Sequence, residues 1–416
     1  MQEDTQLSRR HYLASGGVFA MAGCLSRVPN FRNESYGNLE DTWRMRSHDG
    51  RNSGYSPMAT PPREQAAESW TGPMIGGNLP NAPAVDEQRV YSASDEFVYS
   101  FTRDDGKLEW VAKFDGLTFA IAPTIGSENI YVAEMMTEHE DRGVAKLVSI
   151  DPESGNVVWE LEAHITSSPI LSDDWLYFAN QPDTGSGYLA AVDGAAGEIL
   201  WQSPFAESGS TRLTTEPAIV DDIVIACGHI RKGDGWQGRT IAFDRNDGSE
   251  IWSVDVDNPI SASPVAYDDS VFVCEINGRV SALEKSTGVL QWRNNLDSIE
   301  QIFEPPAVAS HRLFIIGYRR IGAYDVDSGE EVWFKNLGDV KRSFVVTAND
   351  AVYITRDRIL SLNQEDGEEL WSIEKSGYLV SFGSPSVAGK SLFSSSCIKQ
   401  EPMDYYDINT HCVRHY

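Results

Sequence analysis

The chain has 416 residues, of which 41% are hydrophobic and 10% aromatic, so it has the length and apolar content of a folded protein and not of a disordered one. Its formal net charge is −28, from 62 acidic and 34 basic residues. A field of that sign repels phosphate, which argues against binding to nucleic acid and against non-specific binding to an anionic membrane surface. The acids are spread through the sequence rather than gathered in one tail, which indicates a halophilic surface.

The first 23 residues have the pattern of a twin-arginine signal peptide. Arg9 and Arg10 precede a short, weakly apolar stretch that ends at Ala22, and a stretch of that length cannot cross a bilayer as a stable helix. Twin arginines in this position are typical of the route that exports folded proteins. The residues before Cys24 resemble a lipobox, which implies that Cys24 becomes a lipidated N-terminus. We therefore predict export by the twin-arginine route and attachment to the outer face of the cell membrane through the lipid anchor alone.

Residues 24–42 are predicted to form a flexible, lipid-anchored tether. They are polar and poor in branched aliphatic side chains, a composition that does not supply a core. The tether contains the glycosylation-type sequence Asn33-Glu34-Ser35, and the sequence leaves open whether Asn33 is modified. The remaining residues, 43–416, are predicted to form one domain.

Most of that domain is a sequence repeat. One copy, residues 191–201, has a small residue, an apolar residue and Asp, then Gly four residues after the Asp and Trp four residues after the Gly. The pattern recurs in seven copies, in four of which the aspartate is kept, with a period of about 40–45 residues. The tryptophans that end the copies are Trp110, Trp159, Trp201, Trp252, Trp292, Trp333 and Trp371.

Each repeat predicts four short strands. An extended stretch with a central Pro is followed by a β-branched and aromatic run, and the Asp and Trp segments then form a hairpin around the Gly turn. Four strands in about 40–45 residues is the period of a propeller blade. The first strands begin near residues 81, 121, 167, 215, 262, 304, 344 and 383. The sequence thus predicts an all-β, eight-bladed propeller, with seven blades as the alternative.

Two segments of the chain could supply the strand that closes the ring. A closed ring needs its last edge strand to be paired. Ser69-Trp70 looks like a Trp strand detached from its repeat, which would place the N-terminal segment in the last blade, and residues 411–416 are the alternative. Cys397 and Cys412 both fall in the last blade, and a disulfide between them is left open.

The repeats resemble those of the pyrroloquinoline-quinone (PQQ) propeller family and, more loosely, WD40 and YVTN repeats. The PQQ-like family includes the quinoprotein dehydrogenases and the BamB-type propeller lipoproteins of outer-membrane assembly. The segment from Trp43 to Pro57 is also similar to the lead-in segment of this family. The resemblance implies that the seven repeat tryptophans dock onto the peptide of a neighbouring blade's Gly turn, a role suited to a large apolar ring with one N–H donor.

The resemblance leaves two functions open. The dehydrogenases of the family hold PQQ and Ca²⁺ in the axial funnel, often beside a disulfide between adjacent cysteines, and this chain has no adjacent cysteine pair. We expect no cofactor and no metal, and we assign no catalytic residue. The prediction is a monomeric, non-catalytic binding or scaffold module for a protein or another envelope component. The alternative is a PQQ- and Ca²⁺-dependent oxidoreductase acting on an alcohol or a sugar.

Two groups of residues are candidate partner contacts. A base stands three residues before the repeat's small residue in five blades, and the longest insertions, 135–145, 180–187, 205–212 and 228–238, lie on the same side of the ring. Such loops are where propellers place recognition, and exposed Trp and Arg dominate binding hot spots. Pairing with neighbouring carboxylates is the alternative for the repeat bases. The candidates are Arg212, Arg231, Lys232 and Trp236 from the insertions and Lys146, Arg239, Arg279, Arg320 and Arg358 from the repeat position.

Overall fold

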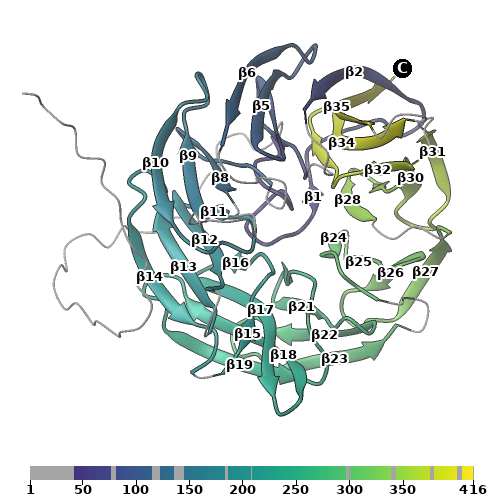
Figure 1. Cartoon of the computed structure of the whole chain (residues 1–416). Coiled ribbons are helices and arrows are strands. Elements are labelled where there is room, and N and C mark those ends of the chain that lie inside the picture. The colour runs from purple at the N-terminus through teal and green to yellow at the C-terminus, as the bar shows by residue number, and fades with distance from the viewer. Residues whose placement is uncertain are drawn as a thin grey trace, which may run out of the picture.

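The computed structural model describes residues 42–75, 81–114, 122–134, 145–182, 186–207, 209–296, 299, 301–338, 343–374, 379–400 and 405–415. Regular structure in these residues consists of β-strands, which form eight sheets around a central axis (Figure 1). The predicted eight-bladed propeller is therefore confirmed. No helix in this described part of the chain could span a membrane. The predicted signal peptide, Cys24 and Asn33 lie outside the described residues.

In blades 1 to 4 the first strand lies nearest the axis and the fourth at the rim (Figure 1). Blade 1 consists of β3 (Ala84–Val85), β4 (Arg89–Ser94), β5 (Phe97–Thr102) and β6 (Leu108–Lys113). Blade 2 consists of β7 (Thr124–Ile125), β8 (Ile130–Glu134), β9 (Lys146–Ile150) and β10 (Val157–Glu162). Blade 3 consists of β11 (Ile170–Ser172), β12 (Trp175–Asn180), β13 (Tyr188–Asp193) and β14 (Ile199–Pro204). Blade 4 consists of β16 (Ala218–Val220), β17 (Ile223–Lys232), β18 (Gly235–Asp244) and β19 (Glu250–Val256), with β15 (Thr211–Arg212) beside β17.

Blades 5 to 8 repeat this order, and blades 7 and 8 include strands from the N-terminal segment. Blade 5 consists of β20 (Val265–Tyr267), β21 (Ser270–Cys274), β22 (Arg279–Glu284) and β23 (Leu290–Asn295). Blade 6 consists of β24 (Ala307–Ala309), β25 (Arg312–Ile316), β26 (Arg320–Asp325) and β27 (Glu331–Asn336). Blade 7 consists of β28 (Phe344–Ala348), β29 (Ala351–Thr355), β30 (Arg358–Asn363) and β31 (Glu369–Glu374), with β1 (Tyr55–Ser56) beside β28. Blade 8 consists of β33 (Ser386–Ala388), β34 (Ser391–Gln400), β35 (Tyr405–His415) and β2 (Ala66–Met74), with β32 (Leu379–Phe382) beside β34.

Burial follows the position of a strand within its blade. Every residue of β8 is buried, and β22 is buried except at its two ends, because neighbouring blades cover both faces of the middle strands. The rim strand β14 instead alternates exposed and buried residues over its second half, as expected where one face packs and the other meets solvent. The core is therefore a set of apolar layers between adjacent blades.

A tryptophan on each rim strand joins its blade to the next one. Its indole Nε1 donates a hydrogen bond of 2.8–3.0 Å to a backbone carbonyl oxygen of the following blade. Eight such bonds run around the ring, including one from Trp70, which lies outside the seven repeat copies. The pairs are Trp70–Arg103, Trp110–Pro152, Trp159–Gly194, Trp201–Arg245, Trp252–Lys285, Trp292–Val326, Trp333–Gln364 and Trp371–Pro62.

The turn glycine makes room for the docked indole. Gly155 has a φ of 72°, and a Cβ built there would lie 2.7 Å from the ring of Trp110. A side chain at this position would be strained by the left-handed backbone and would also collide with the ring. Trp371 docks onto Pro62 instead, because the third and fourth strands of blade 8 come from distant parts of the chain and share no turn.

The N-terminal segment closes the ring. Strand β2 pairs antiparallel with β35, from Ala66 opposite His415 to Met74 opposite Ile408, and so forms the rim strand of blade 8. The alternative in which residues 411–416 form the rim strand is wrong, because residues 411–415 belong to β35, the third strand.

The last blade contains no disulfide between its two cysteines. Cys412 lies opposite Phe393 in the ladder, four positions from Cys397, which is roughly 13 Å along a strand. That separation exceeds the reach of a disulfide. The four described cysteines are all free thiols, and Cys227 and Cys274 are buried within blades 4 and 5.

The docking bond of Trp201 can be tested by removing its donor. Trp201→Phe deletes the indole N–H that bonds the carbonyl of Arg245 in a buried position, and leaving a buried carbonyl unpaired costs about 1–3 kcal/mol. We expect the free energy of unfolding in urea to fall by at least that amount. The matched control is Trp175→Phe, on a half-buried ring whose Nε1 has no bonding partner among the described residues. Equal losses in the two variants would contradict the docking role.

Candidate functional site

The antiparallel blades give the propeller two different faces. The turns between strands one and two and between strands three and four emerge on one face, which we call the turn face. The loops between strands two and three, and the connections from blade to blade, emerge on the opposite face, which we call the loop face. The four predicted insertions all fall on the loop face, although residues 135–144 lie outside the described part of the chain.

The belt, residues 42–56, runs around the inside of the ring (Figure 1). Its backbone carbonyls accept hydrogen bonds of 2.6–3.0 Å from the innermost strands of blades 1, 2, 4, 5, 6 and 7. These strands would otherwise direct unpaired N–H groups into the channel. The accepting and donating residues are Trp43 and Val85, Arg44 and Ile125, Gly50 and Ile219, Arg51 and Ala266, Ser53 and Val308, and Gly54 and Thr347.

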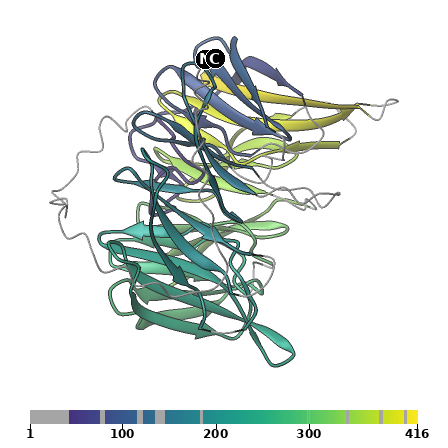
Figure 2. The ribbon, with the colours of Figure 1, turned by 60° about the vertical axis from the view of Figure 1, so that its left-hand side comes forward.

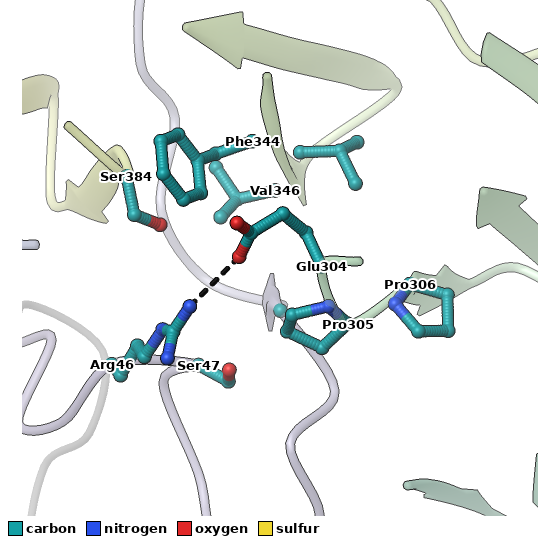
Figure 3. A pocket seen from close by; sticks show the side chains of 10 residues that line it. Arg46, Ser47, Glu304, Pro305, Pro306, Phe344, Val346 and Ser384 are labelled. Atoms are coloured by element: carbon teal, nitrogen blue, oxygen red, sulfur yellow. Dashed lines mark hydrogen bonds and ion pairs between the residues drawn. The ribbon is translucent and has the colours of Figure 1, made fainter. Parts of the chain in front are cut away.

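A three-residue charge cluster lies inside the ring. Arg46 of the belt forms an ion pair of 2.5 Å with Glu216. It forms a second one, of 2.8 Å, with Glu304 (Figure 3). Glu216 precedes the first strand of blade 4, Glu304 precedes the first strand of blade 6, and the Ser263 hydroxyl of blade 5 donates to Glu216. The belt is thereby tied to the centre of the ring by charge as well as by backbone hydrogen bonds.

Burial and charge act in opposite directions on these groups. Burial alone would raise the pKa of Glu216, but attraction to Arg46 and the hydrogen bond from Ser263 outweigh burial and hold that pKa below its usual value. Burial alone would lower the pKa of Arg46, but the two carboxylates outweigh burial and raise it. Arg46 and Glu216 therefore remain charged at neutral pH.

The free space beside Arg46 is small. A pocket lined by Arg46, Glu304, Phe344 and Ser384 (Figure 3) encloses about 10 Å³, on the order of one water molecule. Pockets that hold cofactor-sized molecules measure roughly 300–1,000 Å³. Within the described ranges, no three His, Cys, Asp or Glu side chains are grouped to hold a metal ion.

The repeat-position bases lie at separate points around the loop-face rim. Carboxylates pair with several of them: Glu160 with Lys146 at 3.0 Å, Asp255 with Arg239 at 2.6 Å, Asp257 with Arg279 at 3.2 Å and Glu374 with Arg358 at 3.4 Å. The guanidinium of Arg320 lies 5.7 Å from the ring centre of Phe334. These bases do not converge on one site, and their role as partner contacts stays a prediction.

Three of the four insertion candidates come together in blade 4. Arg212 and Arg231 lie 4.8 and 5.7 Å from the ring centre of Trp236. Residues 228–238, expected as an insertion, are the ends of the two ten-residue strands β17 and β18 and the turn between them. The fourth candidate, Lys232, is the last residue of β17.

The sequence predictions missed the axial cluster. Arg46, Glu216 and Glu304 are 170 and 258 residues apart in their two pairs, so no local motif joins them. One signal was present: the residue before the strand-one Pro is small in blades 1, 3 and 5 (Ala82, Ser168 and Ser263), but an acid precedes the prolines in blade 4 (Glu216) and in blade 6 (Glu304). An acid in a row of small inward positions indicates a buried partner of opposite charge.

Comparison with known proteins identifies the family. The family model described as outer membrane protein assembly factor BamB matches residues 40–232, 236–319, 293–373 and 317–401. The chain belongs to the BamB family. The outer membrane protein assembly factor BamB of Yersinia pestis is 25% identical over 258 residues, which cover 56% of this chain and 62% of that relative.

Solved structures share the propeller. BamB from Moraxella catarrhalis superposes with a TM-score of 0.63 at 15% identity, covering 85% of this chain and 98% of that one. The quinohemoprotein alcohol dehydrogenase from Comamonas testosteroni superposes with a TM-score of 0.72 at 12% identity, covering 89% and 80%. Because a BamB protein and an alcohol dehydrogenase both match, these likenesses establish the fold and do not select the activity.

The axial cluster predicts a pH-dependent stability. Arg46→Met leaves Glu216 buried without its cation, and breaking a buried pair on one side costs about 3–5 kcal/mol. Because the pKa of Glu216 is lowered in the folded protein, the ion pair stabilises the wild type at every pH above the usual pKa of a carboxyl group. This stabilisation is lost as the pH falls through the lowered pKa. We expect the stability difference between the two proteins in urea unfolding to be large at pH 7 and to narrow towards pH 4.

The control for this experiment is Arg44→Met, a neighbouring belt residue with no ion pair among the described residues. It should reproduce any loss that comes from the belt backbone or from the removed charge alone. An Arg46→Met variant with the stability and pH profile of Arg44→Met would show that the cluster does not hold the belt.

Proposed function

We propose that this propeller is a non-catalytic scaffold of the cell envelope that binds other proteins through its loop face. The family relationship supports the proposal, since relatives such as the Yersinia pestis protein are named outer membrane protein assembly factors. An assembly role for the present chain is inferred from that relationship. Its anchoring through Cys24 and its export by the twin-arginine route remain predictions of the sequence.

The observation that carries the proposal is that the belt lines the axial channel. Backbone from Trp43 to Gly54 occupies the inner edge of six blades, in the region where a propeller enzyme needs room for its substrate. A channel lined by the chain's own backbone leaves the outer surfaces for recognition. Loops on one end of a rigid ring are suited to that task, because the ring fixes their relative positions.

The residues that line the channel do not fit a quinone with its Ca²⁺. A Ca²⁺ site needs several oxygen ligands with free lone pairs and uncompensated negative charge. Glu216 and Glu304 each form an ion pair with Arg46, so one of the two negative charges is compensated and an oxygen of each carboxylate is already engaged. The adjacent pocket of about 10 Å³ is also far too small for a quinone cofactor. These features support a non-catalytic function over the dehydrogenase alternative.

The loop-face proposal is tested by photo-crosslinking in the native cell. A crosslinking amino acid at Lys232 lies at the loop-face end of blade 4, and one at Asp247 lies in the Gly turn at the opposite end of the same blade. We expect covalent adducts with envelope proteins at position 232 and few or none at position 247. Adducts at 247 alone, or no adducts at any described loop-face position, would contradict partner binding through this face.

The enzyme alternative is tested by reconstitution. The purified protein is dialysed with PQQ and Ca²⁺ at high salt, and quinone absorbance and dye reduction with alcohols and sugars are measured beside a quinoprotein dehydrogenase. We expect no stoichiometric uptake and no turnover, because the belt and Arg46 line the axial region. Stoichiometric quinone with substrate-dependent dye reduction would overturn the proposal.

A further inference from the structure

The end of the blade 4 hairpin carries a compact cationic and aromatic cluster. We call this cluster the blade 4 tip and define it by Arg212, His229, Arg231 and Trp236. In the ladders Arg212 lies opposite His229, and Arg231 lies opposite Trp236. Because side chains alternate along a strand, these four side chains lie on one face of the hairpin. The hairpin extends outward beyond its neighbours at the loop face (Figures 1 and 2).

Two arginines flank one indole in the blade 4 tip. Their guanidinium carbons lie 4.8 and 5.7 Å from the Trp236 ring centre, within the range of a cation–π contact. The ring of His229 meets Trp236 edge-on at 6.2 Å. Burial lowers the pKa of His229, and Arg212 lowers it further, so the imidazole is neutral near pH 7. The cluster therefore presents arginine charges on a fixed aromatic support.

Among the residues that the structure describes, no acid pairs with these two arginines. Neither Arg212 nor Arg231 has a carboxylate partner within the described residues, and the side chain of Arg231 bonds only the carbonyl of Gly233. Both are exposed, as is Lys232 beside them. Repeat-position bases on the same face, by contrast, have carboxylate partners, as Lys146, Arg239 and Arg358 do. In a chain of net charge −28, an unpaired basic cluster is an exception.

We propose that the blade 4 tip binds an extended acidic segment of a partner protein. The proposal rests on the scaffold function above and names the chemistry of one of its partners. A guanidinium stacked on an aromatic face keeps its in-plane N–H donors free, and these donors match a carboxylate. The stacking also reduces the side-chain entropy that binding would otherwise remove.

An acidic peptide fits the blade 4 tip better than an anionic membrane does. A flat bilayer pressed against the loop face would also approach exposed acids there, such as Asp257, whose side chain is 79% exposed. An extended segment can contact the projecting hairpin alone and avoid those acids. Trp236 is half-buried between the arginines, which favours a contact along the ring edge over insertion into lipid.

The experiment is a fluorescence anisotropy titration with a labelled peptide that alternates Glu and Ala, beside the same peptide with Gln in place of Glu. It is run at about 1 M salt, where the Debye length is roughly 3 Å and the long-range repulsion from the acidic surface is screened. We expect the Glu peptide to bind and the Gln peptide not to bind. The double variant Arg212→Gln/Arg231→Gln should weaken binding about tenfold or more.

The matched control is Arg239→Gln/Arg279→Gln, which removes the same charge from the same face but from ion-paired side chains. It should bind the Glu peptide as the wild type does, and thermal unfolding should show that both double variants are folded. Trp236→Leu should also weaken binding, because the aromatic support is lost.

Three results would overturn the proposal. The wild type could fail to bind the Glu peptide, or the two double variants could weaken binding of that peptide equally. In the third result, phosphatidylglycerol vesicles bind in a way that needs Arg212 and Arg231, and the Glu peptide does not bind. The crosslinking experiment separates this failure from failure of the scaffold function. Protein adducts at Lys232 without peptide binding would reject the acidic partner and retain the scaffold.

Discussion

The fold depends on a non-covalent joint between the beginning and the end of the described chain. A row of four-stranded blades has two open ends, and each would expose apolar faces and unpaired strand edges to water. Here the joint is the β2–β35 ladder, which places Trp70 against blade 1, and the docking of Trp371 onto Pro62. The eight indole bonds form a continuous ring only because the N-terminal segment supplies one donor and one acceptor.

The same N-terminal segment determines which groups line the interior of the ring. To reach blade 8 from its entry beside blade 1, the chain passes along the inner strands, and its carbonyls satisfy their N–H groups on the way. Arg46 then lies among Glu216 and Glu304, where two buried carboxylates without a cation would be costly. Closure of the ring and the lining of the channel therefore have one structural cause.

The repeated parts of the fold were predictable, and the unrepeated parts were not. The Gly and Trp spacing is local chemistry, because a positive φ and a docked indole need those residues in each of the seven repeat copies, so the blade number and most docking partners follow from the period. The exceptions, Trp70 as a donor and Pro62 as an acceptor, belong to the N-terminal segment. The belt occurs once, and its contacts cross most of the sequence. Cys397 and Cys412 share a blade, but only the register of β34 and β35 shows that they lie apart. In blade 4, residues 228–238 were expected to form an insertion, whereas they form the end of an extended hairpin.

The blade 4 tip differs in charge from the rest of the surface. A surface with many more acids than bases repels acidic partners from every side, and screening by salt shortens the range of that repulsion without removing contacts at hydrogen-bond distance. Most repeat-position bases are held by acids of their own blades, so they add little net attraction. Arg212 and Arg231 differ because their neighbour is an indole and not a carboxylate. An aromatic support holds a positive charge in place without cancelling it, and this difference allows an acidic protein to present one selective basic site.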